Sequence, residues 1–78
     1  MEVTFEAVRD IIVSTLSCDA GEVKPDTSLL EDLDADSLEL VELSMALQDA
    51  LGVGIEDEDL EKIQTVQDIV DYIRSKKQ

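Results

Sequence analysis

The sequence predicts an all-α fold: a small four-helix bundle with a long loop between the first and second helices and a short third helix. Apolar residues recur at the helical spacing i, i+3 and i+4 in three separate stretches of the chain. The alternation of apolar and polar residues that is typical of strands reaches no useful length. The 78 residues are enough for one modest core, so we expect residues 1–78 to form a single domain.

The first helix is expected to begin after Thr4, whose hydroxyl can cap it, and to end near Ser17 or Cys18. Its inward face carries Phe5, Val8, Ile11, Ile12 and Leu16. Residues 18–36 then form a long connection, because Gly21 and Pro25 disfavour helix there. The connection has room for one short helical turn. We expect four apolar side chains to anchor it to the core: Val23, Leu29, Leu30 and Leu33.

Asp36 is the expected N-cap of the second helix, with Glu39 three residues later in the capping-box position. Gly52 and Gly54 are expected to end this helix. One of its faces should be buried, and that face carries Leu40, Leu43, Leu47, Ala50 and Leu51.

Two helices are expected in the last third of the chain. Asp57 can begin a short one that contains Leu60 and Ile63. Thr65 can cap the final one, in which Lys76 and Lys77 lie near the C-terminal end that favours positive charge. The inward positions of the final helix are Val66, Ile69, Val70 and Ile73.

The charge of the chain is strongly negative and uneven. A net charge of −14 argues against nucleic acid as a partner, because neutralising phosphates needs a surface of Lys and Arg. Hydrophobic residues make up 44% of the chain, which argues against disorder despite this charge. Residues 31–62 hold twelve of the twenty acidic residues and one of the six basic residues. This region should form a negative surface suited to basic partners.

Cysteine usage and hydropathy narrow the class of protein further. Cys18 is the single cysteine, so the chain can form no internal disulfide and has no Cys/His set for zinc. It contains no signal-peptide pattern and no apolar run long enough for a membrane span. We therefore expect a cytoplasmic protein without membrane insertion and without a metal ion. We also expect it to be a monomer.

The face of the second helix opposite its core stripe mixes apolar and acidic residues. Leu38, Glu42, Met45 and Asp49 fall together there, flanked by Glu39 and Val41. Such a surface suits transient docking, since charges steer a basic partner and apolar side chains provide desolvated contact. The alternative is that Val41 and Met45 simply extend the core.

Ser37 is the most informative residue, and it lies in the run EDLDADSLE at residues 31–39. The chain has no His, so this hydroxyl lacks an obvious local base and suits modification by another protein. The run resembles the Asp-Ser-Leu prosthetic-group attachment site of acyl carrier proteins. The resemblance continues through residues 42–47, 58–63 and 65–68, and thus covers nearly the whole chain.

This resemblance implies one acyl carrier domain spanning residues 1–78, with no catalytic residues of its own. Ser37 would carry covalent 4′-phosphopantetheine derived from coenzyme A, as O-(pantetheine 4′-phosphoryl)serine. The thiol of that arm would present growing acyl chains, as thioesters, to enzymes of fatty-acid biosynthesis. The implied partners are a phosphopantetheinyl transferase and acyl-chain synthesis and transfer enzymes with basic docking patches. The implied docking residues are Asp36, Leu38, Glu39, Val41, Glu42, Met45 and Asp49.

The resemblance also implies a pocket that shelters the acyl chain between the helices. The matched positions are Leu29, Leu30, Leu33, Leu43, Leu47, Leu60, Ile63, Ile69 and Tyr72. A plain, well-packed core would use the same residues equally well.

Several alternatives remain open from the sequence. Asp34 stands where the family commonly has glycine, and Glu56 where it often has proline, so a specialised free-standing carrier of a polyketide, lipid A or other acyl pathway is the close alternative. A helical interaction module without a prosthetic group is a further one. Asp32, Asp34 and Asp36 imitate the start of a calcium loop, but Ser37 and Leu43 occupy its turn-glycine and bidentate-glutamate positions, which leaves at most a weak cation site. A hydrolase is disfavoured, because the chain has neither His nor a Gly-rich pocket.

Overall fold

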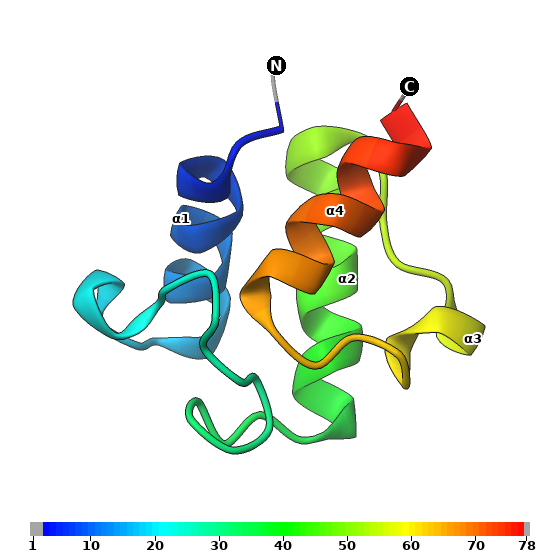
Figure 1. Ribbon diagram of the computed structural model, residues 1–78. Coiled ribbons are helices and arrows are strands. Elements are labelled where there is room, and N and C mark those ends of the chain that lie inside the picture. The colour runs from blue at the N-terminus through cyan, green and yellow to red at the C-terminus, as the bar shows by residue number, and fades with distance from the viewer. Residues whose placement is uncertain (1–2, 78) are drawn as a thin grey trace.

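The computed structural model describes residues 3–77, and these residues fold into four α-helices and one 3-10 turn (Figure 1). The elements in order are α1 (Phe5–Leu16), η1 (Ala20–Glu22), α2 (Ser37–Leu51), α3 (Asp57–Leu60) and α4 (Val66–Lys77). Helix α1 packs against both α2 and α4, and the short α3 packs against α2. The predicted four-helix bundle is confirmed, with its long loop and its short third helix. No helix among residues 3–77 has the length and apolar character needed to cross a membrane.

The helix ends follow from local capping. The Thr4 hydroxyl accepts a hydrogen bond from the Ala7 N–H at 3.1 Å, and the Asp36 carboxylate accepts one from the Glu39 N–H at 2.9 Å. Gly52 ends α2 in the left-handed conformation, with φ of 80°. These predicted caps are confirmed, although Gly54 lies in the connection beyond the helix end.

The start of α4 is capped from both directions. The Asp68 N–H donates to the Thr65 hydroxyl at 3.2 Å, and the Asp68 carboxylate accepts from the Thr65 N–H at 3.1 Å. Thr65 therefore caps α4 as predicted. The third helix is shorter than expected, because it ends at Leu60 and leaves Ile63 in the connection that follows.

The core lies where α1, α2 and α4 face one another. Its fully buried side chains include Val8, Ile12, Leu29, Leu43, Leu47, Val66, Ile69 and Ile73.

Two core predictions were wrong. Ala50 is exposed, because it lies at the edge of the α2 stripe in the last turn, where its short side chain does not reach the core. Leu30 is 52% exposed, because the preceding Leu29 takes the inward position in the turn that these two residues share.

The long connection is held by backbone hydrogen bonds to the segment that precedes α4. Leu29 N–H donates to the Gln64 carbonyl at 2.9 Å, and Val66 N–H donates to the Thr27 carbonyl at 3.1 Å. Ser28 and Thr65 form an isolated antiparallel bridge between these segments. This pairing fixes the connection beside the residues that follow α3, and it brings Leu30 and Ile63 to the same side of the molecule.

Candidate functional site

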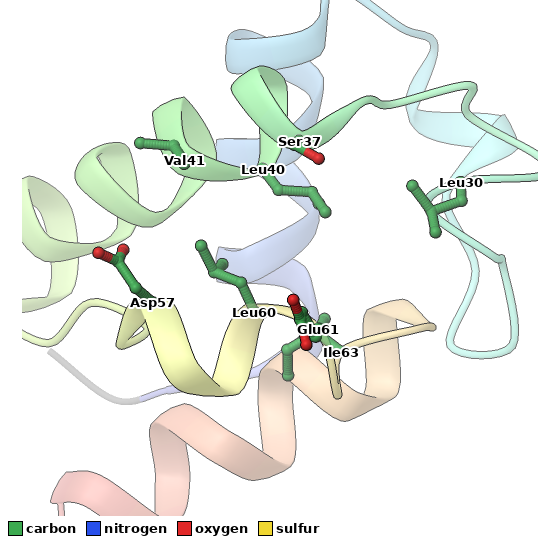
Figure 2. Close-up of a pocket in the computed structure, with 8 residues that line it drawn as sticks. All are labelled: Leu30, Ser37, Leu40, Val41, Asp57, Leu60, Glu61 and Ile63. Carbon is green, nitrogen blue, oxygen red and sulfur yellow. The ribbon is translucent and has the colours of Figure 1, made fainter.

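Ser37 is the first residue of α2 and is exposed. The preceding Asp36 caps the helix with its own carboxylate, so the Ser37 hydroxyl is not used for capping. Ser37 borders a cavity instead (Figure 2). The structure therefore presents a free hydroxyl at the point where the long connection enters α2.

The cavity beside Ser37 has a volume of about 550 Å³ and separates α2 from α3 (Figure 2). Leu40 and Val41 line it from α2, Leu60 and Ile63 line it from α3 and the residues beyond, and Leu30 borders it from the long connection. The volume lies within the range of small-molecule sites, and five apolar side chains suit an aliphatic ligand. Two exposed carboxylates, those of Asp57 and Glu61, complete the lining.

The lining differs from the pocket predicted from the sequence. Leu30, Leu60 and Ile63 are predicted residues that the structure does bring together there. The other six do not border the cavity: Leu29, Leu43, Leu47 and Ile69 are fully buried in the core, and Leu33 and Tyr72 are half-buried against it. The inward-facing residues pack against one another in the core. The cavity therefore lies on the flank of the bundle, where other side chains line it.

Sequence reasoning missed Leu40, Val41, Asp57 and Glu61 as lining residues. A signal for two of them was present, because positions three and four residues after Ser37 lie on the same side of a helix as Ser37 itself. The two acidic residues had no comparable signal, since their position depends on how α3 packs against α2.

The outer face of α2 is open to solvent. Leu38 is 67% exposed, Met45 62% and Val41 38%. Asp36, Glu42 and Asp49 are exposed as well, and Glu39 is half-buried. We call these seven residues the acidic-apolar face. Val41 and Met45 therefore do not extend the core, which was the alternative reading of the sequence.

Tyr72 of α4 reaches the short helix α3. Its hydroxyl donates to the Asp59 carboxylate at 2.7 Å and accepts from the Glu56 N–H at 3.3 Å. The hydrogen bond from Tyr72 holds the pKa of the Asp59 carboxyl below its usual value, and the nearby Lys62 ammonium acts in the same direction. Burial raises the pKa of the Tyr72 hydroxyl, and its hydrogen bond to Asp59 raises it further.

The aspartates before Ser37 have separate structural roles. The Asp32 carboxylate accepts from the Ser28 N–H at 2.8 Å, Asp36 caps α2, and Asp34 adopts a left-handed conformation with φ of 56°. Among residues 3–77 no three Asp, Glu or Cys side chains are arranged to hold a metal ion. The thiol of Cys18 is free, and burial raises its pKa.

Comparison with known proteins places this geometry in a family. The family model described as the phosphopantetheine attachment site matches residues 6–73. The acyl carrier protein of Helicobacter hepaticus is 53% identical over 95% of this chain and 97% of its own length. The chain belongs to the acyl carrier protein family. The acyl carrier protein of Petrotoga mobilis is 57% identical over 92% of this chain and 85% of its own length.

A solved structure of another member of the family has the same fold as this chain. A Mycobacterium tuberculosis protein described as an acyl carrier protein superposes with a TM-score of 0.82 at 31% identity, over 91% of this chain and 95% of that one. The prosthetic group of the family is covalently attached phosphopantetheine. The exposed Ser37 hydroxyl fits such a group, because a phosphoryl group can be added there without displacing a core side chain.

Proposed function

We propose that Ser37 carries the phosphopantetheine of this acyl carrier protein. The observation that supports this most strongly is the exposed Ser37 hydroxyl at the edge of an apolar cavity. Ser44 is buried and bonded to Ile55, and Ser28 accepts from the Glu31 N–H. Ser14, Ser17 and Ser75 are exposed but do not line this cavity.

Attachment requires a separate transferase. The Ser37 oxygen bonds to the phosphorus that bears the pantetheine arm of coenzyme A, the pyrophosphate bond breaks, and adenosine 3′,5′-bisphosphate leaves. The transferase takes the hydroxyl proton and supplies Mg²⁺, since Ser37 has no histidine partner in this chain. The attached group supplies a terminal thiol that holds an acyl chain as a thioester. The chain itself acts as a carrier and contributes no catalytic residue.

The cavity beside Ser37 is proposed to shelter the acyl chain. Burying each methylene group of an aliphatic chain is worth about 0.8 kcal/mol, and the side chains of Leu30, Leu40 and Leu60 offer an apolar surface for it. Asp57 and Glu61 leave the cavity edge negative, which favours uncharged chains.

The acidic-apolar face of α2 is proposed to dock the transferase and the acyl-chain enzymes. Its carboxylates would steer basic patches on these partners, and Leu38 and Met45 would make the desolvated contact. Because the face begins at Asp36, a partner bound there lies next to Ser37.

We assign the carrier to fatty-acid biosynthesis in the cytoplasm, acting as a monomer. An aliphatic cavity supports unbranched hydrocarbon chains, and the free Cys18 thiol fits a reducing compartment. Intact mass of the protein purified from its own cells tests the pathway. Saturated straight-chain acyl groups support the assignment, whereas polyketide intermediates on the arm would indicate the specialised pathway instead.

The attachment site is tested by intact mass after incubation with coenzyme A and a broad-specificity phosphopantetheinyl transferase. Wild type should gain one phosphopantetheine, and Ser37→Ala should gain none. Ser75→Ala is the matched control and should be modified like wild type, because Ser75 is exposed on α4 away from the cavity. A mass gain that persists in Ser37→Ala would overturn the proposal.

A further inference from the structure

The short helix α3 forms one wall of the cavity but is too short to be stable alone. It has four residues, and two of them, Asp57 and Leu60, line the cavity. A single helical turn in isolation is strongly unfavourable, because its nucleus fixes several residues for one hydrogen bond. The position of this wall must therefore be set by contacts with the rest of the fold.

Two side chains make such contacts, one from each neighbouring helix. From α2, the buried Ser44 hydroxyl donates to the Ile55 carbonyl and accepts from the Ile55 N–H, both at 2.8 Å. This fixes the connection just before α3. From α4, Tyr72 bonds to the Glu56 N–H and to the Asp59 carboxylate, and so holds the start and the middle of α3.

The Tyr72 contact is reinforced by charge and depends on this particular sequence. The Lys76 ammonium lies 5.5 Å from the centre of the Tyr72 ring and 4.0 Å from the Glu56 carboxylate. Residue 56 can donate its backbone N–H to Tyr72 because it is not a proline. A proline at this position would have no N–H to donate.

We propose that Tyr72 is a positioning residue that fixes the α3 wall and thereby limits the length of acyl chain that the cavity shelters. The inference rests on the proposed function, since it assumes that an acyl chain enters the cavity beside Ser37. Tyr72 does not line the cavity itself. It acts through Asp59 and Glu56, which share the helical turn that places Leu60 opposite Leu40 (Figure 2).

The geometry of these bonds predicts how the length of the sheltered acyl chain changes when the Tyr72 hydroxyl is removed. Hydrogen bonds weaken steeply when their distance or angle departs from the optimum, so a shift of α3 relative to α4 weakens the bonds from Tyr72 and is opposed by them. A longer chain needs more room between α2 and α3, and the bonds from Tyr72 oppose the movement of α3 that would provide it. Removing the Tyr72 hydroxyl frees the wall to move, and the cavity should then admit longer chains.

The test uses the full chain, loaded by a broad-specificity phosphopantetheinyl transferase from butanoyl, hexanoyl, octanoyl, decanoyl and dodecanoyl coenzyme A. The readout is the gain in melting temperature of each acyl form over the unacylated holo form. Wild type should show a gain that passes through a maximum along the series. In Tyr72→Phe the maximum should move to a longer chain, whatever the melting temperature of the unacylated form.

Variants of Asp59 keep the test independent of the tyrosine substitution. Asp59→Asn retains an oxygen that accepts from the Tyr72 hydroxyl. The largest gain in melting temperature should therefore stay at the same chain length as in wild type. Asp59→Ala removes the acceptor and should move the maximum to a longer chain, as Tyr72→Phe does. If Tyr72→Phe fails to fold, Asp59→Ala still provides the test. Ser75→Ala on the same helix is the control for general loss of a hydroxyl.

The outcomes separate this inference from the proposed function. If no acyl chain stabilises wild type in a length-dependent way, the sheltering cavity is wrong and the inference falls with it. If wild type shows the dependence but Tyr72→Phe and Asp59→Ala keep the same maximum, the cavity stands and the positioning role of Tyr72 is overturned.

Discussion

At the scale of single residues, Asp34 has an unusual backbone conformation and Tyr72 has a perturbed hydroxyl. Asp34 holds a left-handed backbone just before the Ser37 helix, and Tyr72 has a hydroxyl that is harder to deprotonate than usual. Both positions lie close to the elements that frame the cavity. Each gives a prediction that depends on one residue.

Asp34→Gly should stabilise the protein. A non-glycine residue at φ of 56° carries strain, which is smaller for Asp than for most residues, while glycine adopts this conformation freely. After the extra unfolded-state entropy of glycine is subtracted, the net gain should be about 0.5–1 kcal/mol. Urea unfolding measures it, with Asp34→Ala as the control. Alanine should destabilise, and equal stability of all three chains would contradict the strain argument.

Tyr72 should titrate at a pKa above the ordinary value of tyrosine. It is the single tyrosine of a chain without Trp, so the ultraviolet absorbance of its phenolate reports on it directly. Asp59→Asn should lower this pKa part of the way, because burial remains when the carboxylate charge is removed. Since the folded-state pKa is raised, the associated stability is present below about pH 10 and is lost as pH rises through the raised value. An unshifted titration in wild type would contradict the bond to Asp59.

At the scale of the elements, three different parts of α2 have different roles: its first residue, its outer face and its inner face. Its start presents Ser37, its outer face carries exposed acidic and apolar residues, and its inner face fills the core. The polar residue on the inner face, Ser44, holds the connection to α3. The opposite faces of α2 can therefore be tested separately.

Ser44→Ala should destabilise the protein by about 2–3 kcal/mol, because it leaves the buried N–H and carbonyl of Ile55 without their partner. Ser14→Ala, at an exposed position of α1, should change the free energy of unfolding by no more than about 0.5 kcal/mol. Chemical denaturation of both variants makes the comparison. Similar values for the two would show that the Ser44 contacts contribute little.

Glu42→Lys should slow association with the phosphopantetheinyl transferase, and the deficit should shrink as salt is raised. Glu42 is exposed on the acidic-apolar face, so folding should be little affected. Glu6→Lys on α1 makes the same change in net charge at an exposed position outside that face. Stopped-flow binding at low and high salt should show the effect for Glu42 and much less for Glu6. Equal slowing by both variants would point to net charge alone.

At the scale of the whole molecule, electrostatic repulsion opposes compaction. The net charge is −14, and three ion pairs in the described part of the chain join Arg9 to Asp10, Lys62 to Asp59 and Lys76 to Glu56. Most acidic side chains among residues 3–77 are therefore outside any ion pair. The core that must offset this repulsion is small, so the protein should respond to ionic strength.

Added NaCl should raise the melting temperature of the apo protein, because screening weakens repulsion in the compact state more than in the expanded chain. Thermal melting at low and high salt measures the rise, and KCl should give the same curve. MgCl₂ at matched ionic strength separates screening from any direct ion binding. A melting temperature that does not change with NaCl would show that the surface charges are already compensated.

The sequence by itself determined the helices, their caps and the serine at the start of α2. Thr4, Asp36, Gly52 and Thr65 act on residues within about one helical turn, so their roles follow from neighbours in the chain. Only the tertiary structure decided the lining of the cavity, the exposure of Leu30 and the link from Tyr72 to Asp59. The residues involved are far apart in sequence or lie on different elements. Their contacts depend on how α3, α4 and the long connection pack, which helical periodicity does not encode.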